Sequence, residues 1–255
     1  WWGHQIPAWY CDDCGETVVA KEAPCTCPKC GSTKLTQDPD TLDTWFSSAL
    51  WPFSTLGWPN ENAEDYNYFY PTNTLVTGYD IIGFWVSRMI FSGLAYTGKA
   101  PFDTVCIHGI VRDSQGRKMS KSLGNVINPD EVVDQYGADT MRLYEMFMGD
   151  FEQAAPWQTS AIAGCNRFLD RVWALSDKLV EGEGYRPQVE TLMHQTIKKV
   201  GADIETLKMN TAIAQLMTLV NALYDNGGAT KAELETVVQL LNPFAPHMTE
   251  ELWEK

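Results

Sequence analysis

The sequence lacks any apolar run long enough to cross a membrane, and it is poor in basic residues. No stretch approaches the ~20 consecutive apolar residues that a transmembrane helix needs, and no secretory signal is present. Lysine and arginine number 19 against 33 acidic residues, which gives a net charge of −14. That balance argues against nucleic-acid binding through overall charge, because neutralising phosphates needs Lys and Arg. We expect a cytoplasmic protein without a membrane partner, in which any nucleic-acid contact uses a local basic surface.

Length and composition fit a globular protein of one large or two medium domains. The 255 residues are 44% hydrophobic and 20% charged, and no internal repeat or low-complexity segment stands out. The chain has no initial Met, and Trp1-Trp2 is an implausible natural start. We therefore expect a piece of a longer protein.

Four of the seven cysteines form two Cys-x-x-Cys pairs, Cys11 with Cys14 and Cys27 with Cys30. Two such pairs present four thiolates to one tetrahedral zinc ion, and a glycine follows each pair, which favours the required tight turn. The pattern predicts a structural Zn²⁺ site in a knuckle over residues 11–30. Cys25 is an alternative ligand in place of Cys27, although Cys27 has the better spacing. Disulfide bonds are the competing interpretation, and nothing in the sequence suggests the oxidising compartment that they need.

The middle of the chain has the pattern of a parallel strand–helix–strand unit. Residues 75–76 and 104–107 are short apolar runs typical of buried strands, and residues 81–94 are a long apolar helix candidate between them. In such units, ligand-binding residues lie at the carboxyl ends of the strands. His108 and Gly109 follow the second run directly, so they are candidate ligand-binding residues.

From about residue 143 onward, apolar residues repeat at helical spacing. The clearest expected face consists of Met193, Ile197, Val200, Ile204 and Leu207. Expected helix starts are Asn128-Pro129, Thr159, Thr230 and Pro246. Thr230 with Glu233 forms a capping-box pattern. The sequence therefore predicts an α/β part followed by an all-α part.

The segment Lys118-Met119-Ser120-Lys121-Ser122, called the lysine loop below, combines two lysines three residues apart with two hydroxyls. Ammonium groups act as point charges on phosphate oxygens, and hydroxyls donate hydrogen bonds to them. Gly116 and Gly124 flank the segment and allow it to bend. The pattern favours a mobile loop that grips a triphosphate, and a basic surface turn is the alternative.

These segments together resemble one family. His108-Gly109 followed by the lysine loop and Leu123-Gly124-Asn125 resembles the ATP-binding loop of class I aminoacyl-tRNA synthetases. Residues 43–53 and 70–85 resemble the valine-charging branch of that family, and residues 1–10 resemble the return from its inserted editing domain into the catalytic core. The resemblance covers roughly residues 1–142.

The resemblance implies an architecture. Residues 1–142 are expected to form the second half of a Rossmann-like α/β catalytic domain, with the zinc knuckle at 11–30 and the lysine loop at 118–122. Residues 143–255 are expected to form an all-α, anticodon-binding-type helix bundle, truncated at its C-terminus. Parts of this bundle look more like the leucine-charging branch than the valine-charging one, so the chain looks mosaic, and the identity of its tRNA stays open.

The resemblance also implies a reaction: ATP, with Mg²⁺, activates valine to valyl-adenylate, and the valyl group is transferred to tRNA. Lys118 and Lys121 are the expected catalytic residues, which contact the triphosphate and stabilise charge on the leaving pyrophosphate. The whole lysine loop, with Met119, Ser120 and Ser122, is expected to bind ATP. His108 and Gly109 are expected to contact the adenosine.

Three further residues are expected to bind the amino acid. By resemblance, Asp80 holds the α-ammonium group of valine, and Ile81 and Trp45 form walls of its pocket. Favourable charge at a helix N-terminus is the alternative role for Asp80, and core packing is the alternative for Trp45. Gly83 departs from the family pattern, which often has a large aromatic residue there.

Two other functions stay open at this point. One is charging of leucine or isoleucine, which only the helix bundle favours. The other is not an enzyme function: a fragment that binds tRNA without catalysis. The family's other nucleotide motif, His-Ile-Gly-His, does not occur, and the editing domain is expected to be missing. We therefore expect this chain to be inactive or weakly active by itself. We also expect a monomer.

Overall fold

The computed structural model describes residues 3–255 and divides into two compact units, Trp1–Cys106 and Ile107–Lys255. Trp1 and Trp2, part of the segment that resembles the editing-domain return, lie outside the described residues. The expected boundary at residue 142, between the catalytic domain and the helix bundle, stays a prediction. Within the described part of the chain, no helix is long and apolar enough to cross a bilayer.

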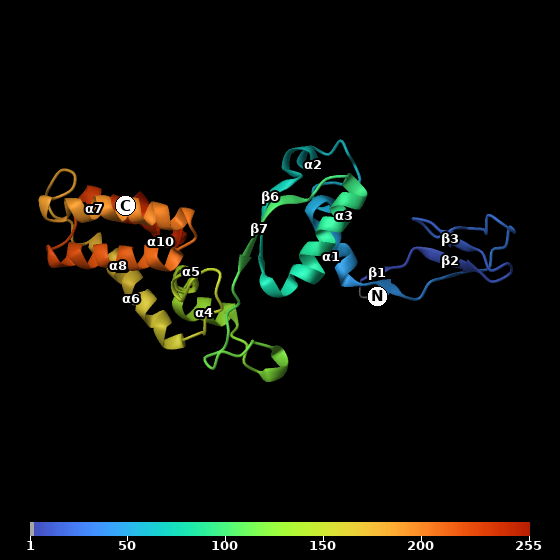
Figure 1. Cartoon of the computed structure of the whole chain (residues 1–255), viewed down its shortest axis with the longest axis horizontal. Coiled ribbons are helices and arrows are strands. Elements are labelled where there is room, and N and C mark those ends of the chain that lie inside the picture. The colour runs from blue at the N-terminus through green and yellow to red at the C-terminus, as the bar shows by residue number, and fades with distance from the viewer. Residues whose placement is uncertain (1–2) are drawn as a thin grey trace. The chain divides into compact units, whose positions relative to one another are not determined.

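The first unit begins with small antiparallel sheets (Figure 1). Strand β1 (His4–Gln5) pairs with β5 (Thr41–Leu42). Strand β2 (Ala8–Cys11) lies between β3 (Thr17–Val19) and β4 (Leu35–Gln37). The four paired cysteines lie on β2 and in the turns that follow β2 and precede β4.

The predicted strand–helix–strand unit is confirmed. Strand β6 (Thr72–Gly78), helix α3 (Ser87–Thr97) and strand β7 (Phe102–His108) follow one another, and β6 pairs with β7. The Thr72 amide donates to the carbonyl of Pro101 over 2.9 Å, so the strands start side by side. Helices α1 (Thr44–Ser54) and α2 (Glu64–Phe69) complete the unit, and α1 packs on α3.

The long helix predicted over residues 81–94 is interrupted. It begins as a 3₁₀ turn at Tyr79–Ile81, continues as a π-helical turn at Ile82–Val86 and becomes α-helical only at Ser87. The Ser87 hydroxyl donates to the carbonyl of Gly83, and glycine is a poor helix former. π turns often mark functional sites, and this one follows the candidate residues Asp80 and Ile81 directly.

The second unit is helical after its first loop. Its helices are α4 (Pro129–Tyr136), α5 (Ala138–Phe147), α6 (Thr159–Leu175), α7 (Pro187–Glu205), α8 (Met209–Asp225), α9 (Lys231–Leu241) and α10 (Pro246–Glu254). The predicted starts at Pro129, Thr159, Lys231 after Thr230, and Pro246 are confirmed. Helices α2 and α5 were not predicted from the sequence.

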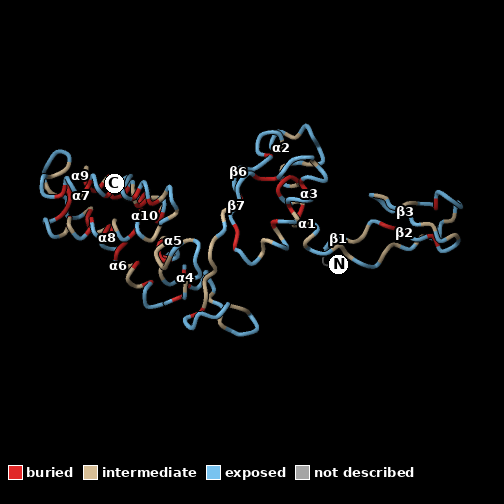
Figure 2. The backbone as a smooth tube through the Cα atoms, in the orientation of Figure 1, coloured by how far each residue is buried: buried red, intermediate tan, exposed pale blue. Residues whose placement is uncertain are grey.

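The buried face of α7 differs from the predicted one. Met193 and Val200 are fully buried as expected, but Ile197 is 37% exposed and Thr196 is buried instead. The Thr196 hydroxyl accepts a hydrogen bond from the Gln215 side chain of α8, which satisfies a polar group inside the core. Figure 2 shows buried and exposed residues interspersed along both helices. Because Thr196 is buried in place of Ile197, the buried face of α7 is shifted by one residue from the predicted face.

A buried ion pair joins the start of α7 to the start of α9. Glu233 is fully buried, completes the predicted capping box with Thr230, and receives the Arg186 guanidinium at 2.8 Å. Burial raises the pKa of the Glu233 carboxyl, but the Arg186 guanidinium and the backbone amides of Arg186 and Thr230 outweigh it, so that pKa lies below its usual range. The carboxylate is therefore charged at neutral pH.

We predict that Arg186→Ala lowers the free energy of unfolding by about 3–5 kcal/mol, because it leaves a buried carboxylate without its counter-ion. Urea denaturation at pH 7 measures the change. Lys231→Ala is the control, because its pair with Glu235 is 3.9 Å long and largely exposed, and it should cost at most about 1 kcal/mol. Equal losses in the two variants would contradict this role of Arg186.

Candidate functional site

The four paired cysteines come together in space. Their sulfur atoms all lie within 4.8 Å of one another, with Sγ–Sγ distances of 3.6 Å for Cys11–Cys30 and for Cys14–Cys27. A tetrahedral zinc ion with Zn–S bonds of about 2.3 Å places its sulfurs about 3.8 Å apart. The cluster therefore has the size and donor set of a zinc site. Cys25 is exposed and does not belong to the cluster.

Each pair is held in a turn that needs glycine. The Gly15 amide donates to the Cys11 carbonyl, and the Gly31 amide donates to the Cys27 carbonyl, both over 2.8 Å. Gly15 has a φ of 71° and Gly31 a φ of 75°, values that side chains disfavour. These turns explain why glycine follows each Cys-x-x-Cys pair.

The thiols of the cluster differ in acidity. Burial raises the pKa of Cys11, but the backbone amides of Cys14 and Asp13 and the neighbouring thiols lower it to about 7. The Glu16 amide lowers the pKa of Cys14, but the neighbouring thiols and burial outweigh it and raise the value to about 12. Zinc binds thiolates, so binding would release protons.

The lysine loop is organised by one carboxylate. Asp113 Oδ1 accepts hydrogen bonds from the backbone amides of Gln115 at 3.0 Å and Arg117 at 2.8 Å. Its Oδ2 accepts from Arg117 Nε at 2.7 Å and from Asn125 Nδ2 at 3.0 Å. Asp113 is only 7% exposed. The Asn125 amide first, then Arg117 and Gln115, hold the pKa of Asp113 well below its usual range, against the effect of burial.

Asn125 holds the first half of the lysine loop. Besides Asp113, its side-chain NH₂ donates to the Lys118 carbonyl at 3.3 Å, and its side-chain oxygen accepts from the Ser120 amide at 2.9 Å. The Ser120 hydroxyl accepts from the Leu123 amide at 3.3 Å and so caps a 3₁₀ turn at Lys121–Leu123. Ser120 and Asn125 therefore shape the loop from within.

The two lysines of the loop face solvent. Lys118 and Lys121 are both exposed. The backbone of Lys118 forms an antiparallel bridge with Arg112, which joins the chain before the turn to the chain after it. A hydrogen-bonded backbone that carries two exposed lysines is suited to binding an anion with several charged oxygens.

His108 and Gly109 have structural roles of their own. The His108 ring packs edge-on against Phe151 with a centroid distance of 6.0 Å, and its Nδ1 lies 2.7 Å from the Gly109 carbonyl. A Cβ atom at residue 109 would lie 2.1 Å from the Gln153 carbonyl oxygen. This packing against Gln153 requires glycine at position 109 for a reason other than contact with adenosine. The adenosine contact stays a prediction.

The candidate amino-acid-binding residues lie on two elements of the first unit, helix α1 and the 3₁₀ turn at Tyr79–Ile81. Trp45 is in the first turn of α1, where the Asp43 side chain caps the helix by accepting from the Trp45 amide at 2.8 Å. The Trp45 ring stacks on Phe84 of the π turn, with a centroid distance of 5.8 Å. Asp80 is exposed and Ile81 half-buried in the 3₁₀ turn just before.

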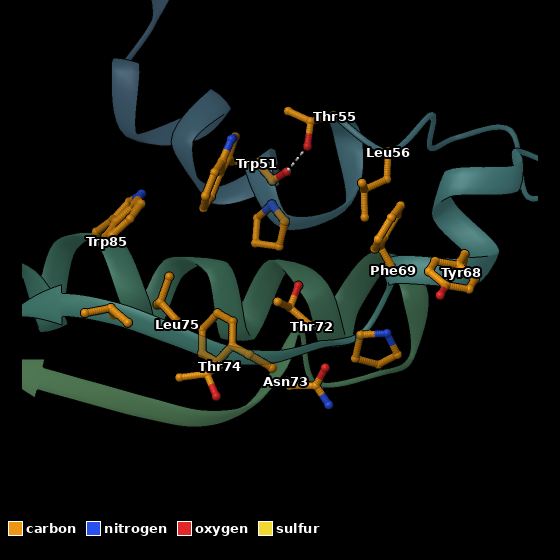
Figure 3. A pocket seen from close by; sticks show the side chains of 14 residues that line it. Trp51, Thr55, Leu56, Tyr68, Phe69, Thr72, Asn73, Thr74, Leu75 and Trp85 are labelled. Atoms are coloured by element: carbon orange, nitrogen blue, oxygen red, sulfur yellow. Dashed lines mark hydrogen bonds between the residues drawn. The ribbon is translucent and has the colours of Figure 1, made fainter. Parts of the chain in front are cut away.

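An apolar groove lies beside strand β6 and was not predicted from the sequence. It has a volume of about 860 Å³, and α1, α2 and the π turn contribute to its lining (Figure 3). Trp51 and Phe69 line it and remain 50% and 54% exposed, and Trp51 stacks on Trp85 at 5.9 Å. No motif marks such a groove, because its residues come from separate elements.

Comparison with known sequences places most of this chain in described families. Residues 25–158 match the family described as tRNA synthetases class I (I, L, M and V). Residues 188–255 match the anticodon-binding domain of tRNA ligase.

Curated relatives match over the whole chain. The valine--tRNA ligases of Carboxydothermus hydrogenoformans and Thermotoga maritima are each 42% identical, over 100% of this chain and 33% of the relative. The chain thus spans about a third of the length of these relatives. The similarity also runs through the helical part, which on its own looked closer to the leucine branch.

Solved structures agree on the fold. The Agrobacterium radiobacter K84 agnB2 LeuRS–tRNA–LeuAMS complex matches 99% of this chain and 40% of that chain, with a TM-score of 0.80 and 26% identity. A Mycobacterium tuberculosis methionyl-tRNA synthetase in complex with methionyl-adenylate matches 82% of this chain and 49% of that chain, with a TM-score of 0.61 and 18% identity. These likenesses confirm the predicted α/β class with a helical C-terminal region.

We predict that Asp113→Asn increases the hydrogen-exchange rates of the Gln115 and Arg117 amides about tenfold or more, because both lose a charged acceptor. The stabilisation by Asp113 should be complete above the unfolded pKa of about 3.9 and should be lost as pH falls through the lower folded value. Asp134→Asn, at an exposed position of α4, is the matched control. Unchanged exchange in Asp113→Asn would contradict the role of this carboxylate.

Proposed function

The chain belongs to the class I tRNA synthetases of the isoleucine, leucine, methionine and valine group, and we propose that it carries the ATP-binding loop and part of the amino-acid pocket of a valine--tRNA ligase. The names of its curated relatives support valine as the amino acid. Because the chain spans a third of those relatives, the activity of the whole protein is part of the proposal. So are its cytoplasmic location, its monomeric state and its contact with tRNA.

The observation that carries the proposal is the lysine loop. Asp113 and Asn125 fix its backbone through a network of short hydrogen bonds, and Lys118 and Lys121 stay exposed. Such pre-organisation lowers the cost of placing ammonium groups around a triphosphate. A basic surface turn would not need a buried, four-fold hydrogen-bonded carboxylate at its base.

In the proposed reaction, a carboxylate oxygen of valine attacks the α-phosphorus of ATP. A bond forms between that oxygen and the phosphorus, and the bond from the phosphorus to the bridging oxygen breaks, so pyrophosphate leaves with the electron pair. Lys121 and Lys118 stabilise the charge that grows on the leaving group. Mg²⁺ bound to the phosphates would neutralise further charge.

The remaining candidate residues would orient the substrates. His108 and Gly109 would contact the adenosine from the end of β7. Asp80 would hold the α-ammonium group, and Ile81 and Trp45 would form pocket walls, with Trp45 kept in place by Asp43 and Phe84. A segment with the His-Ile-Gly-His motif would complete the nucleotide site, and it is not part of this sequence.

The same proposal covers zinc and tRNA. Cys11, Cys14, Cys27 and Cys30 would hold a structural Zn²⁺ that ties β2 to the turn preceding β4, because their sulfurs all lie within 4.8 Å of one another. Residues 1–142 would belong to the catalytic domain and residues 143–255 to a tRNA-contacting bundle. The match of residues 188–255 to an anticodon-binding domain supports the second assignment.

Leucine is the second candidate amino acid. The structural likeness to the LeuRS–tRNA–LeuAMS complex covers 99% of the chain. The valine relatives are more similar in sequence, at 42% against 26% identity, so valine is preferred.

We predict one zinc ion per chain when the protein is purified without chelator. Cys11→Ser should abolish stoichiometric binding, because it removes a buried thiolate ligand. Cys25→Ser should retain it, because that exposed cysteine lies outside the cluster. Metal analysis by mass spectrometry measures both, and well under one zinc per wild-type chain would contradict the site.

We predict that Lys121→Ala weakens ATP binding about tenfold or more, the loss expected for one charge-assisted contact. Binding of a non-hydrolysable valyl-adenylate analogue should change little, because it has no β- or γ-phosphate. Calorimetry measures both, and Lys99→Ala, at another exposed lysine, is the control.

Two outcomes would count against the assigned role of Lys121. One is unchanged ATP affinity in the variant. The other is an equal loss for ATP and for the adenylate analogue, which would indicate general damage to the loop.

A further inference from the structure

The two cysteine turns are two copies of one structural pattern. Residues 11–16 and 27–32 each begin with Cys-x-x-Cys-Gly. In each copy the backbone amide of the first residue donates to the carbonyl of the sixth residue. The N–O distance is 2.9 Å from Cys11 to Glu16 and 2.8 Å from Cys27 to Ser32. In each copy the glycine amide also donates to the carbonyl of the first cysteine. The metal cluster is therefore built from a repeated unit.

Side chains at equivalent positions cross between the two copies. Lys29, third in its copy, donates to Glu16, sixth in the other, with an Nζ–Oε2 distance of 2.8 Å. Asp13, also third, accepts from Ser32, also sixth, with an Oγ–Oδ2 distance of 2.6 Å. The third residue of each copy thus contacts the sixth residue of the other. We call these two contacts the clasp.

The clasp spans the two halves of the cluster. Cys11 and Cys14 come from one copy and Cys27 and Cys30 from the other, so a bound ion leaves when the copies separate or when sulfurs detach in turn. Separation of the copies requires both clasp contacts to open. Lys34 reinforces one of them by donating to Asp13 at 3.1 Å.

Exposure indicates what such contacts contribute. Lys29 and Glu16 are 62% and 38% exposed in their side chains, and ion pairs this exposed add little to folding stability. A contact that must open before the copies separate affects a rate instead.

We propose that the clasp controls how fast the cluster releases its metal, with Lys29, Glu16, Asp13 and Ser32 as positioning residues. The proposal rests on the zinc site proposed above and is independent of the lysine loop. In this proposal Lys29 acts through its contact with Glu16 and not only as a positive charge beside four thiolates.

The experiment measures zinc transfer from the loaded full chain to an excess of a chromogenic chelator. Lys29→Glu should release zinc roughly five- to tenfold faster than wild type, because a contact becomes a repulsion. Lys21→Glu makes the same charge change at an exposed lysine of the same unit and should stay within about twofold of wild type. Thermal melting of the zinc-loaded variants checks that each is folded.

The charge-swapped double variant tests the partner. Lys29→Glu with Glu16→Lys restores the pair and should return the rate to within about threefold of wild type. Ser32→Ala leaves the charge unchanged, opens the other contact and should also speed release. It keeps the test available if the charge variants do not fold.

Three results would overturn the clasp. Lys29→Glu and Lys21→Glu could release zinc at the same rate. The swapped variant could be as fast as Lys29→Glu, which would assign the effect to the field of one lysine. If the wild-type chain contains no zinc, both the clasp and the zinc site are contradicted, but the lysine-loop proposal is not.

Discussion

The carboxylate of Asp113 is the constraint on which the candidate ATP site depends. It is nearly buried, it remains charged, and its donors come from Gln115, Arg117 and Asn125. Burying a charge is costly unless hydrogen bonds replace its water, so the chain around it has little conformational freedom. Asn125 extends this order to Lys118 and Ser120. The exposed lysines therefore stand on a backbone that is already shaped before any ligand arrives.

Local signals in the sequence predicted much of the fold. The strand–helix–strand unit, the Asn128 cap, the Thr230–Glu233 capping box and the cysteine cluster all depend on residues close together in sequence, where spacing and turn chemistry decide. Each is present in the structure. The lysine loop was identified by its residue types, but Asp113, which holds it, was not. Its contacts with Gln115 and Arg117 are local, like an Asx turn, but its contact with Asn125 comes from twelve residues further along, which local spacing does not predict.

The differences arise where individual side-chain or backbone contacts override the expected pattern. Gly83 and Ser87 break the expected helix, and the following aromatics stack on Trp45 and Trp51 of α1. The face of α7 rotates because Thr196 finds a polar partner on α8. Gly109 is needed because its backbone packs closely against Gln153, whereas the family resemblance pointed only to a ligand contact. The groove beside β6 likewise exists only once separate elements pack together.

The most direct test of the account is calorimetric titration of the purified chain with non-hydrolysable valyl-, isoleucyl- and leucyl-adenylate analogues. We predict measurable binding of the valyl analogue and weaker binding of the larger two, because a pocket walled by Trp45 and Ile81 would exclude larger side chains. Leucyl binding as tight as valyl binding would contradict valine as the amino acid. Binding of none of the three would contradict the claim that this chain carries part of the amino-acid pocket.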